Sequence, residues 1–594
     1  MTNFSTAICL VATVCSLAQA ADHKFGGARR LNNLTWEVLK LDQQPVRADQ
    51  TYHFTTPRSR WIYLHVRGTD ADNPLRFSLD DEPILELSGG AQETMRFLPA
   101  GVHRLGIHPQ GSRMIDHLVL RSIPEILLHN FTDRPAGRFK TTHADYLQQQ
   151  IIPHVNTFVV PRAIVVGEHP YLPMFHKWRN SGRRWLSSYN AHGTPDVGDG
   201  NFSVDEAFQF ITTRAVVTSP LMDGTLCDEF VGYDDISYAN YGKAFRRIKA
   251  LPAFEDKLFY IYAVTLHSSP HGRALANSII ETGGVLAWER YLATQPTAAA
   301  ARAYLEEVLL QEARHYRRRC PGSIERMAAC FGFYSKPGGH MLNLYPGVNQ
   351  KVWLDMQFHL AANDPTFRDL YGLMGYHTEY SDEETLRWMC KLFRHYGIEG
   401  RTERATSDPY LSPHLDNGDF VEGLSGWTID PAADESVRAI RKAGLGYLQA
   451  RDGKPQGDTA LRTVRSAARP NRFSQELTNL QPGRWYTFRM MTANLDDLSK
   501  QVKPAVRVTI DGVKLAPERS FTQLIHNPTW RKVPPFDGER RKAWHTYHWH
   551  LFQAQGKTAR LTISDWLEST TAGGPVGQQL AFNYLQVHPY FASP

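Results

Sequence analysis

Hydrophobic and polar positions change their pattern twice along the chain. From about residue 30 to 125, short runs alternate between apolar and polar residues and are separated by turn residues, as in segments 61–66, 75–79 and 102–107. In a β-strand every second side chain faces the same way, so the apolar residues of each run can face a common core. This region is therefore predicted to form an antiparallel β-sandwich.

From about residue 140 to 400, short apolar runs alternate with longer segments of helical periodicity. The strand candidates are 157–163, 185–189, 224–230, 258–265, 285–289, 328–334 and 370–376. The helix candidates between them include 204–217, 238–251, 298–317 and 383–396. This alternation predicts a (β/α)₈ TIM-like barrel of the usual size, with the eighth strand expected near residues 341–345. A doubly wound open sheet is the alternative.

After a polar, turn-rich linker at residues 401–413, the chain returns to alternating β patterns, for example at 487–490, 505–510 and 559–563. The sequence therefore predicts a multidomain protein. Its expected parts are a signal peptide at 1–20, an N-terminal β-sandwich at 21–135, a barrel at 136–402 and a C-terminal β-sandwich of jelly-roll type at 413–594.

Three stretches of the C-terminal part are similar to jelly-roll carbohydrate-binding modules. Residues 417–427 (NGDFVEGLSGW) resemble their opening strand, 474–477 with 480–486 their central strand-turn-strand, and 554–556 with 561–565 a later strand. The resemblance implies a galactose-binding-like sandwich, which would either bind sugar or serve as a structural module.

The N-terminus has the pattern of an export signal. An apolar stretch from Ile8 to Leu17 is followed by Ala18-Gln19-Ala20, which predicts cleavage after Ala20 and a secreted or periplasmic protein. An uncleaved anchor is the alternative. No later segment is apolar for 18 residues, so no membrane span is expected.

Composition and the absence of known motifs exclude several classes of partner and site. Hydrophobic residues make up 42% of the 594, enough for real cores, and the net charge of +6 is too small to indicate a nucleic-acid partner. The sequence lacks Gly-x-Gly-x-x-Gly, a P-loop, His-Glu-x-x-His, Gly-x-Ser-x-Gly and Cys-x-x-Cys, so no cofactor and no metal are expected. Outside the signal there are four cysteines, for which either a Cys320–Cys330 disulfide or four buried thiols is expected.

Carboxylates occur where three predicted barrel strands end. Asp228 and Glu229 close one strand, Glu289 closes another, and Glu379 follows a third. Catalytic groups of parallel barrels lie at the carboxyl ends of the strands, and glycosidic cleavage uses two carboxyl groups. We expect Glu229 to point inward as the general acid with Asp228 in support, the reverse remaining open. Glu289 is expected as the second carboxylate, with Glu379 as its rival.

Aromatic and polar residues near the same strand ends are predicted to hold the sugar. Trp288 and Tyr376 offer flat apolar faces for a sugar ring. The other candidates for substrate binding are Tyr189, Asn190, His192, His267 and His377.

The whole layout resembles multidomain glycoside hydrolases with a barrel and flanking sandwiches. This resemblance implies a secreted enzyme of carbohydrate metabolism that hydrolyses a poly- or oligosaccharide through paired carboxylates. Because Asp228 stands where the largest retaining clan has asparagine before its glutamate, no stereochemical outcome is predicted. One alternative is a non-catalytic carbohydrate-binding or scaffold protein with a degenerate barrel. Another is a lyase or deacetylase, which would use His192, His267, Tyr334 and His377.

Overall fold

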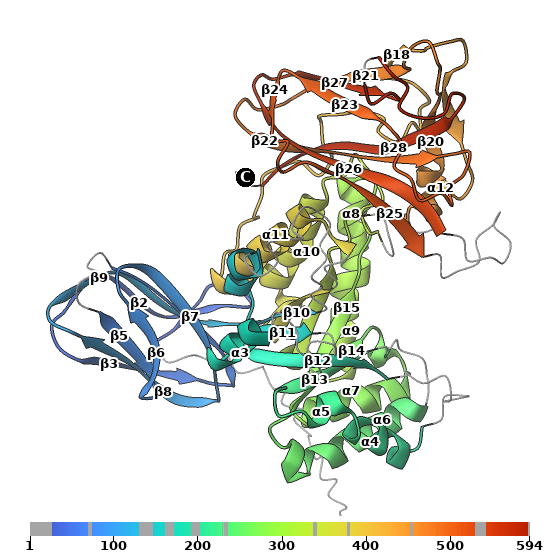
Figure 1. Ribbon diagram of the computed structural model, residues 1–594. Helices are drawn as coiled ribbons and strands as arrows, with labels where there is room; N and C mark the ends of the chain where they lie inside the picture. Colours follow the sequence, from blue (N-terminus) through green and yellow to red (C-terminus); the bar gives the residue numbers. More distant parts are fainter. Residues whose placement is uncertain are drawn as a thin grey trace, which may run out of the picture.

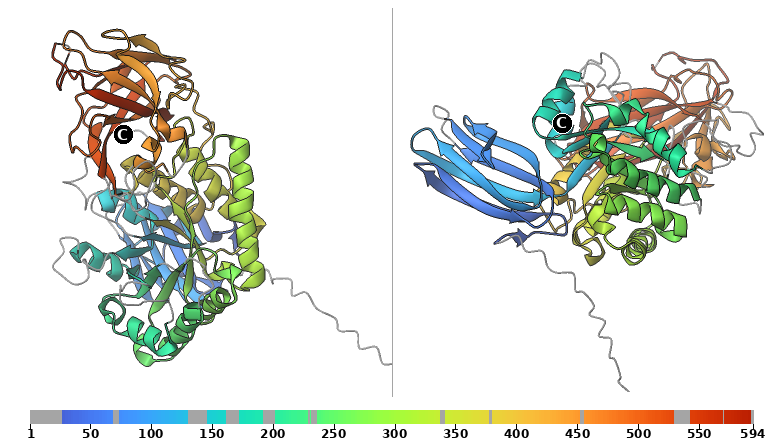
Figure 2. Two further views of the ribbon diagram at one scale, coloured as in Figure 1. Left: turned by 90° about the vertical axis from the view of Figure 1, so that its right-hand side faces the viewer. Right: turned by 90° about the horizontal axis from the view of Figure 1, so that it is seen from below.

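The protein forms a central barrel with a β-sandwich packed at each end of the chain (Figure 1, Figure 2). The computed structural model describes residues 27–68, 74–129, 146–160, 172–191, 202–228, 230, 236–336, 341–376, 380–451, 455–528, 542–568 and 570–591. The predicted signal peptide lies outside these residues. Within them, no helix has both the length and the apolar character needed to cross a membrane.

The N-terminal sandwich consists of two antiparallel sheets. One has the order β1 (Arg29–Arg30), β2 (Trp36–Val46), β9 (Arg113–Ile123), β4 (Arg60–Gly68) and β7 (Gly90–Leu98). The other has the order β3 (Gln50–Thr56), β8 (Gly101–Pro109), β5 (Leu75–Leu79) and β6 (Glu82–Leu87). Alternate apolar residues of both sheets, such as Leu64, Phe77 and Leu118, form their shared core.

Eight parallel strands close the central barrel, which confirms the predicted fold class. They are β10 (Glu125–His129), β11 (Thr157–Val160), β12 (Arg184–Asn190), β13 (Gly224–Asp228), β14 (Leu258–Ala263), β15 (Val285–Arg290), β16 (Met327–Gly332) and β17 (Gly372–Tyr376). The expectation of a strand at residues 341–345 is wrong, because β10 completes the barrel instead. Only Pro124 separates β10 from β9, so in the sequence it resembles one more sandwich strand.

Helices surround the barrel and follow its strands in turn. They are α3 (Leu172–Asn180), α4 (Val204–Thr212), α5 (Ala215–Thr218), α6 (Ile236–Lys249), α7 (Pro270–Glu281), α8 (Ala298–Leu305), α9 (Glu312–Arg319), α10 (Gln350–Asn363) and α11 (Glu383–Leu392). Ser203 and Glu206 form a capping box that fixes the start of α4, and Asp382 caps α11. One apolar cluster fills the barrel, and a larger one fills the layer between strands and helices.

The C-terminal sandwich has a four-stranded and a seven-stranded sheet. The first has the order β18 (Thr428–Asp430), β21 (Arg472–Leu477), β27 (Ala559–Ser564) and β23 (Arg507–Asp511). The second has the order β19 (Val437–Arg441), β20 (Thr459–Val464), β28 (Gln579–Pro589), β22 (Trp485–Asn494), β26 (Lys542–Ala554) and β24 (Val513–Leu515), with β25 (Phe521–Pro528) also paired to β26. The short helix α12 (Leu445–Leu448) joins β19 to β20.

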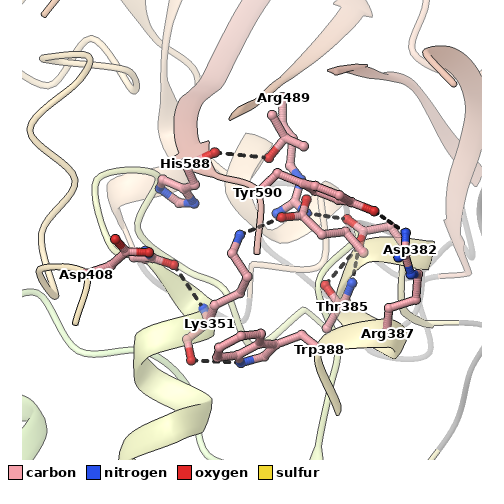
Figure 3. Close-up of polar contacts among 12 residues, drawn as sticks. Lys351, Asp382, Thr385, Arg387, Trp388, Asp408, Arg489, His588 and Tyr590 are labelled. Carbon is pink, nitrogen blue, oxygen red and sulfur yellow. Dashed lines mark hydrogen bonds and ion pairs between the residues drawn. The ribbon is translucent and has the colours of Figure 1, made fainter. Parts of the chain in front are cut away.

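A buried ionic network joins the seven-stranded sheet to the barrel helices (Figure 3). Glu384 of α11 accepts from Lys351 of α10 at 2.6 Å and from Arg489 of β22 at 2.6 Å. Arg489 also lies 3.0 Å from Asp382, which accepts from Tyr547 of β26. The side chains of Lys351, Asp382, Glu384 and Arg489 are at most 7% exposed. The sandwich is therefore docked on the barrel through compensated buried charges.

The same sandwich also holds the chain that follows β16. Tyr584 donates to the Asn343 carbonyl, Arg451 donates to the Leu344 carbonyl, and Met341 donates its backbone N–H to Ala450. Loops after barrel strands form the face on which barrel chemistry occurs. The C-terminal sandwich thus supports part of that face.

The four cysteines Cys227, Cys320, Cys330 and Cys390 are buried free thiols, which confirms the second of the two expectations and excludes the Cys320–Cys330 disulfide. Burial raises the pKa of the Cys320 thiol to about 11. We expect Ellman's reagent to titrate four thiols per denatured chain lacking residues 1–20, and to react slowly with the folded protein, because thiols are unreactive without ionisation and access. A titre of two thiols per chain would instead indicate a disulfide.

Three buried histidines of β26 are expected to make the C-terminal sandwich sensitive to acid. Burial lowers the pKa of His545 to about 4, of His548 to about 3 and of His550 to about 4. They stay neutral in the folded state but bind protons in the unfolded state below about pH 6.5. Each should therefore lower the free energy of unfolding by about 1 kcal/mol per pH unit as pH falls from 6.5 toward 4.

Urea unfolding followed by tryptophan fluorescence at pH 7, 6 and 5 measures this loss. His548→Gln should flatten the pH dependence, whereas His53→Gln, which changes an exposed histidine of β3, should leave it unchanged. Equal slopes in the two variants would contradict the assignment.

Candidate functional site

The candidate site lies at the carboxyl ends of the barrel strands, where alternation decides which side chains face inward. On β13, Leu226 belongs to the cluster inside the barrel and Cys227 to the cluster outside it. Asp228, at intermediate exposure, therefore continues the inward side. Asp228 therefore occupies the inward position expected for Glu229, as in the reverse assignment that the sequence left open, and Glu229 lies outside the described residues.

Glu289 lies on the inward side of β15. Val285 and Ala287, four and two positions before it, belong to the interior cluster, whereas Trp288 belongs to the outer one. The hydroxyl of Tyr291 donates to Glu289 Oε1 at 2.8 Å. This contact orients the carboxylate.

Tyrosines and one histidine surround the two carboxylates. The rings of Tyr291 and Tyr376 stack at 5.4 Å between centroids, with 16° between their planes. The Tyr334 ring lies 5.2 Å from Tyr291, and the Tyr262 hydroxyl is hydrogen-bonded to Nδ1 of His129. Of these residues, Tyr376 alone belongs to the glycosidase site expected from the sequence. Tyr262 lies near the carboxyl end of a predicted barrel strand, so the sequence could have indicated it. His129 could not be indicated in this way, because its strand β10 falls within the predicted N-terminal sandwich.

Asp228 of β13 and Glu289 of β15 face the barrel interior from the two strands that flank β14. Burial raises the pKa of Tyr376, and the charges of Asp228 and Glu289 raise it further. The pKa of Tyr262 and of the Cys330 thiol rises for the same reasons, burial first. These hydroxyls therefore stay protonated at neutral pH and act as hydrogen-bond donors beside two carboxyl groups.

Of the other expected substrate-binding residues, two lie at the same face. Tyr376 is inward beside His129, and Asn190 is exposed at the end of β12, in register with Asp228. Two aromatic assignments are wrong. Trp288 is fully buried and donates its indole N–H to the Val264 carbonyl, and Tyr189 packs against Phe210 in the outer layer.

His267 is buried against α9, where Nε2 lies 2.8 Å from Glu312 Oε2, so it does not join the carboxylates. The remaining expected site residues, His192, His377 and Glu379, lie outside the described residues. The structure thus brings together Asp228, Glu289, Asn190 and Tyr376.

One group within the described part of the chain could offer ligands to a metal ion. Donor atoms of His267, Glu312 and His315 all lie within 4.8 Å of one another. Arg290 Nη2 lies 3.6 Å from Glu312 Oε2, and this positive charge opposes a bound cation.

No protein-family model matches the sequence, and no curated protein matches it. Solved structures do match. A Paenibacillus cycloisomaltooligosaccharide glucanotransferase complexed with cycloisomaltoheptaose is 9% identical, with coverage of 94% of this chain and 72% of that chain and a TM-score of 0.30. A β-galacturonidase from Eisenbergiella tayi bound to galacturonate is 8% identical, with coverage of 59% and 90% and a TM-score of 0.29.

A smaller solved structure matches part of the chain as well. A carbohydrate-binding module in complex with β-1,4-galactotriose is 14% identical, with coverage of 30% of this chain and 99% of that chain and a TM-score of 0.18. The structural neighbours are thus glycoside hydrolases and carbohydrate-binding modules, and this chain combines a closed eight-stranded parallel barrel with flanking β-sandwiches.

Proposed function

We propose that the protein is a glycoside hydrolase that acts on a poly- or oligosaccharide, with Asp228 and Glu289 as its carboxylate pair. One observation carries this proposal: two carboxylates from separate strands, β13 and β15, face the inside of the barrel and act on the same tyrosines. Asp228 takes the place that was expected for Glu229.

The arrangement supplies what glycosidic cleavage needs. One carboxyl group protonates the leaving oxygen, and the other stabilises the positive charge that develops on the sugar ring or activates water. The hydroxyl of Tyr376 is a donor for sugar oxygens, and its ring adds an apolar face. Asn190 offers both a donor and an acceptor at the rim.

Release of reducing sugar ends from a panel of soluble polysaccharides and oligosaccharides tests the proposal. We expect at least one substrate to be cleaved by the wild-type protein and not by the double variant Asp228→Asn/Glu289→Gln. Binding of the same glycans by both proteins, with no product from either, would instead support the non-catalytic carbohydrate-binding protein.

We also propose that the chain is exported, on the basis of the apolar stretch from Ile8 to Leu17 and the Ala18-Gln19-Ala20 motif. Protein secreted or recovered from a periplasmic fraction should begin at Ala21 by N-terminal sequencing. A chain that retains residues 1–20 would show that the segment is not cleaved.

A further inference from the structure

A second polar cavity lies at the opposite end of the barrel from the carboxylates. It has a volume of about 210 Å³ and lies between the N-terminal sandwich and the amino ends of the barrel strands. The sandwich contributes Arg58, Arg60 and Trp61, and the barrel contributes Glu125, Arg326 and Tyr371. The glycoside hydrolase proposal makes no use of this cavity.

Arg60 is an uncompensated charge in the wall of the cavity. It is 4% exposed, and its Nη1 atom is buried with no hydrogen-bond partner. Within the described residues, its Nη2 atom makes one long contact, of 3.4 Å, with the Leu370 carbonyl. Burial lowers the pKa of Arg60 well below its usual value, and the charge of Arg58 lowers it further.

Two of the three nearby carboxylates, Asp369 and Glu125, are committed to other partners, and the third, Glu325, lines the cavity beside Arg326. Asp369 lies 3.4 Å from Arg30 and 3.0 Å from Arg58, and among the described residues it is shared by these two guanidinium groups. Glu125 accepts from Arg184 at 3.0 Å and from the hydroxyls of Tyr260 and Tyr371 at 2.6 and 2.8 Å. Positive charge therefore exceeds negative charge around Arg60.

We propose that this cavity binds a small oxyanion, phosphate or carboxylate in chemistry, which accepts hydrogen bonds from Arg60. A buried guanidinium is costly unless it is paired, and its fork of N–H donors matches the oxygens of phosphate and carboxylate groups. The cavity is too small for a polysaccharide, and the apolar wall of Trp61 favours a compact ligand.

Isothermal titration calorimetry of the full chain without residues 1–20 tests the proposal. The probes are inorganic phosphate and acetate, each compared with sodium chloride at equal ionic strength. We expect saturable binding at one site for phosphate or acetate and none for chloride. Arg60→Met should weaken that binding at least tenfold, whereas Arg472→Met, which changes an exposed arginine of β21, should not affect it.

Circular dichroism and thermal unfolding show whether each variant is folded. If Arg60→Met does not fold, Arg60→Lys, which keeps the charge and loses the fork, should weaken binding while preserving the fold. Absence of saturable binding by the wild-type protein, or equal affinity in the wild-type protein and the folded Arg60 variant, would overturn the proposal. Because the readout is binding, its failure leaves the hydrolase proposal untouched.

Discussion

Replacing Asp228 with asparagine, or Glu289 with glutamine, is expected to lower the turnover of a cleaved glycan about 10³-fold. Each change keeps the size of the side chain but removes its ability to take up a proton or a negative charge, and acid–base catalysis alone contributes about 10² to 10⁴. Initial rates on the substrate identified by the panel measure the loss.

The matched control is Glu281→Gln on α7, whose carboxylate is 57% exposed and pairs with Arg246 at the surface. It should keep wild-type activity, since an exposed pair contributes little. Thermal unfolding should show all three variants folded. Turnover within a few-fold of wild type in Asp228→Asn or Glu289→Gln would remove that residue from the mechanism.

Activated aryl glycosides separate the roles of the two carboxylates. A good leaving group needs no proton, so the variant that lacks the general acid should retain far more activity on an aryl glycoside than on the natural bond. The variant that lacks the other carboxylate should be inactive on both.

Tyr291→Phe provides a related check, because loss of its contact with Glu289 should shift the pH profile of turnover without abolishing turnover.

Replacing Glu384 with glutamine is expected to destabilise the protein by about 3 to 5 kcal/mol. The carboxylate lies between Lys351 and Arg489, and its neutralisation leaves two buried cations with Asp382 as the nearby acid. Burial already lowers the pKa of Lys351, which shows how poorly this environment tolerates an unpaired charge. Urea unfolding monitored by fluorescence measures the change.

Two comparisons make this prediction specific. Arg472→Gln removes an exposed pair with Asp430 and should cost well under about 1 kcal/mol. Glu384→Gln combined with Lys351→Met removes one charge of each sign and should recover part of the lost stability. If Glu384→Gln and Arg472→Gln proved equally stable, the network would not hold the sandwich to the barrel.

The network also connects stability with the proposed activity. Asp382 and Glu384 begin α11, a few residues after Tyr376, and the C-terminal sandwich holds the loop that follows β16 through Asn343 and Leu344. A sandwich with this role is an integral support of the barrel face, whether or not it binds sugar itself.

Much of this architecture was determined by the sequence alone. Alternating runs predict both sandwiches, and alternation of apolar strands with helical segments predicts the barrel, because these patterns are local consequences of strand and helix geometry. The rule that barrel chemistry lies at strand ends also selected Asp228, Glu289 and Tyr376.

Only the tertiary structure decided which side of each strand faces inward. Strands of a parallel barrel are apolar on both faces, so Asp228 and Glu229, or Trp288 and Glu289, cannot be sorted by hydrophobicity. The assignment of β10 to the barrel depends on hydrogen bonds with β11 and β17, which are far away in the chain. The docked sandwich and the uncompensated Arg60 likewise arise from contacts between domains, which no local pattern records.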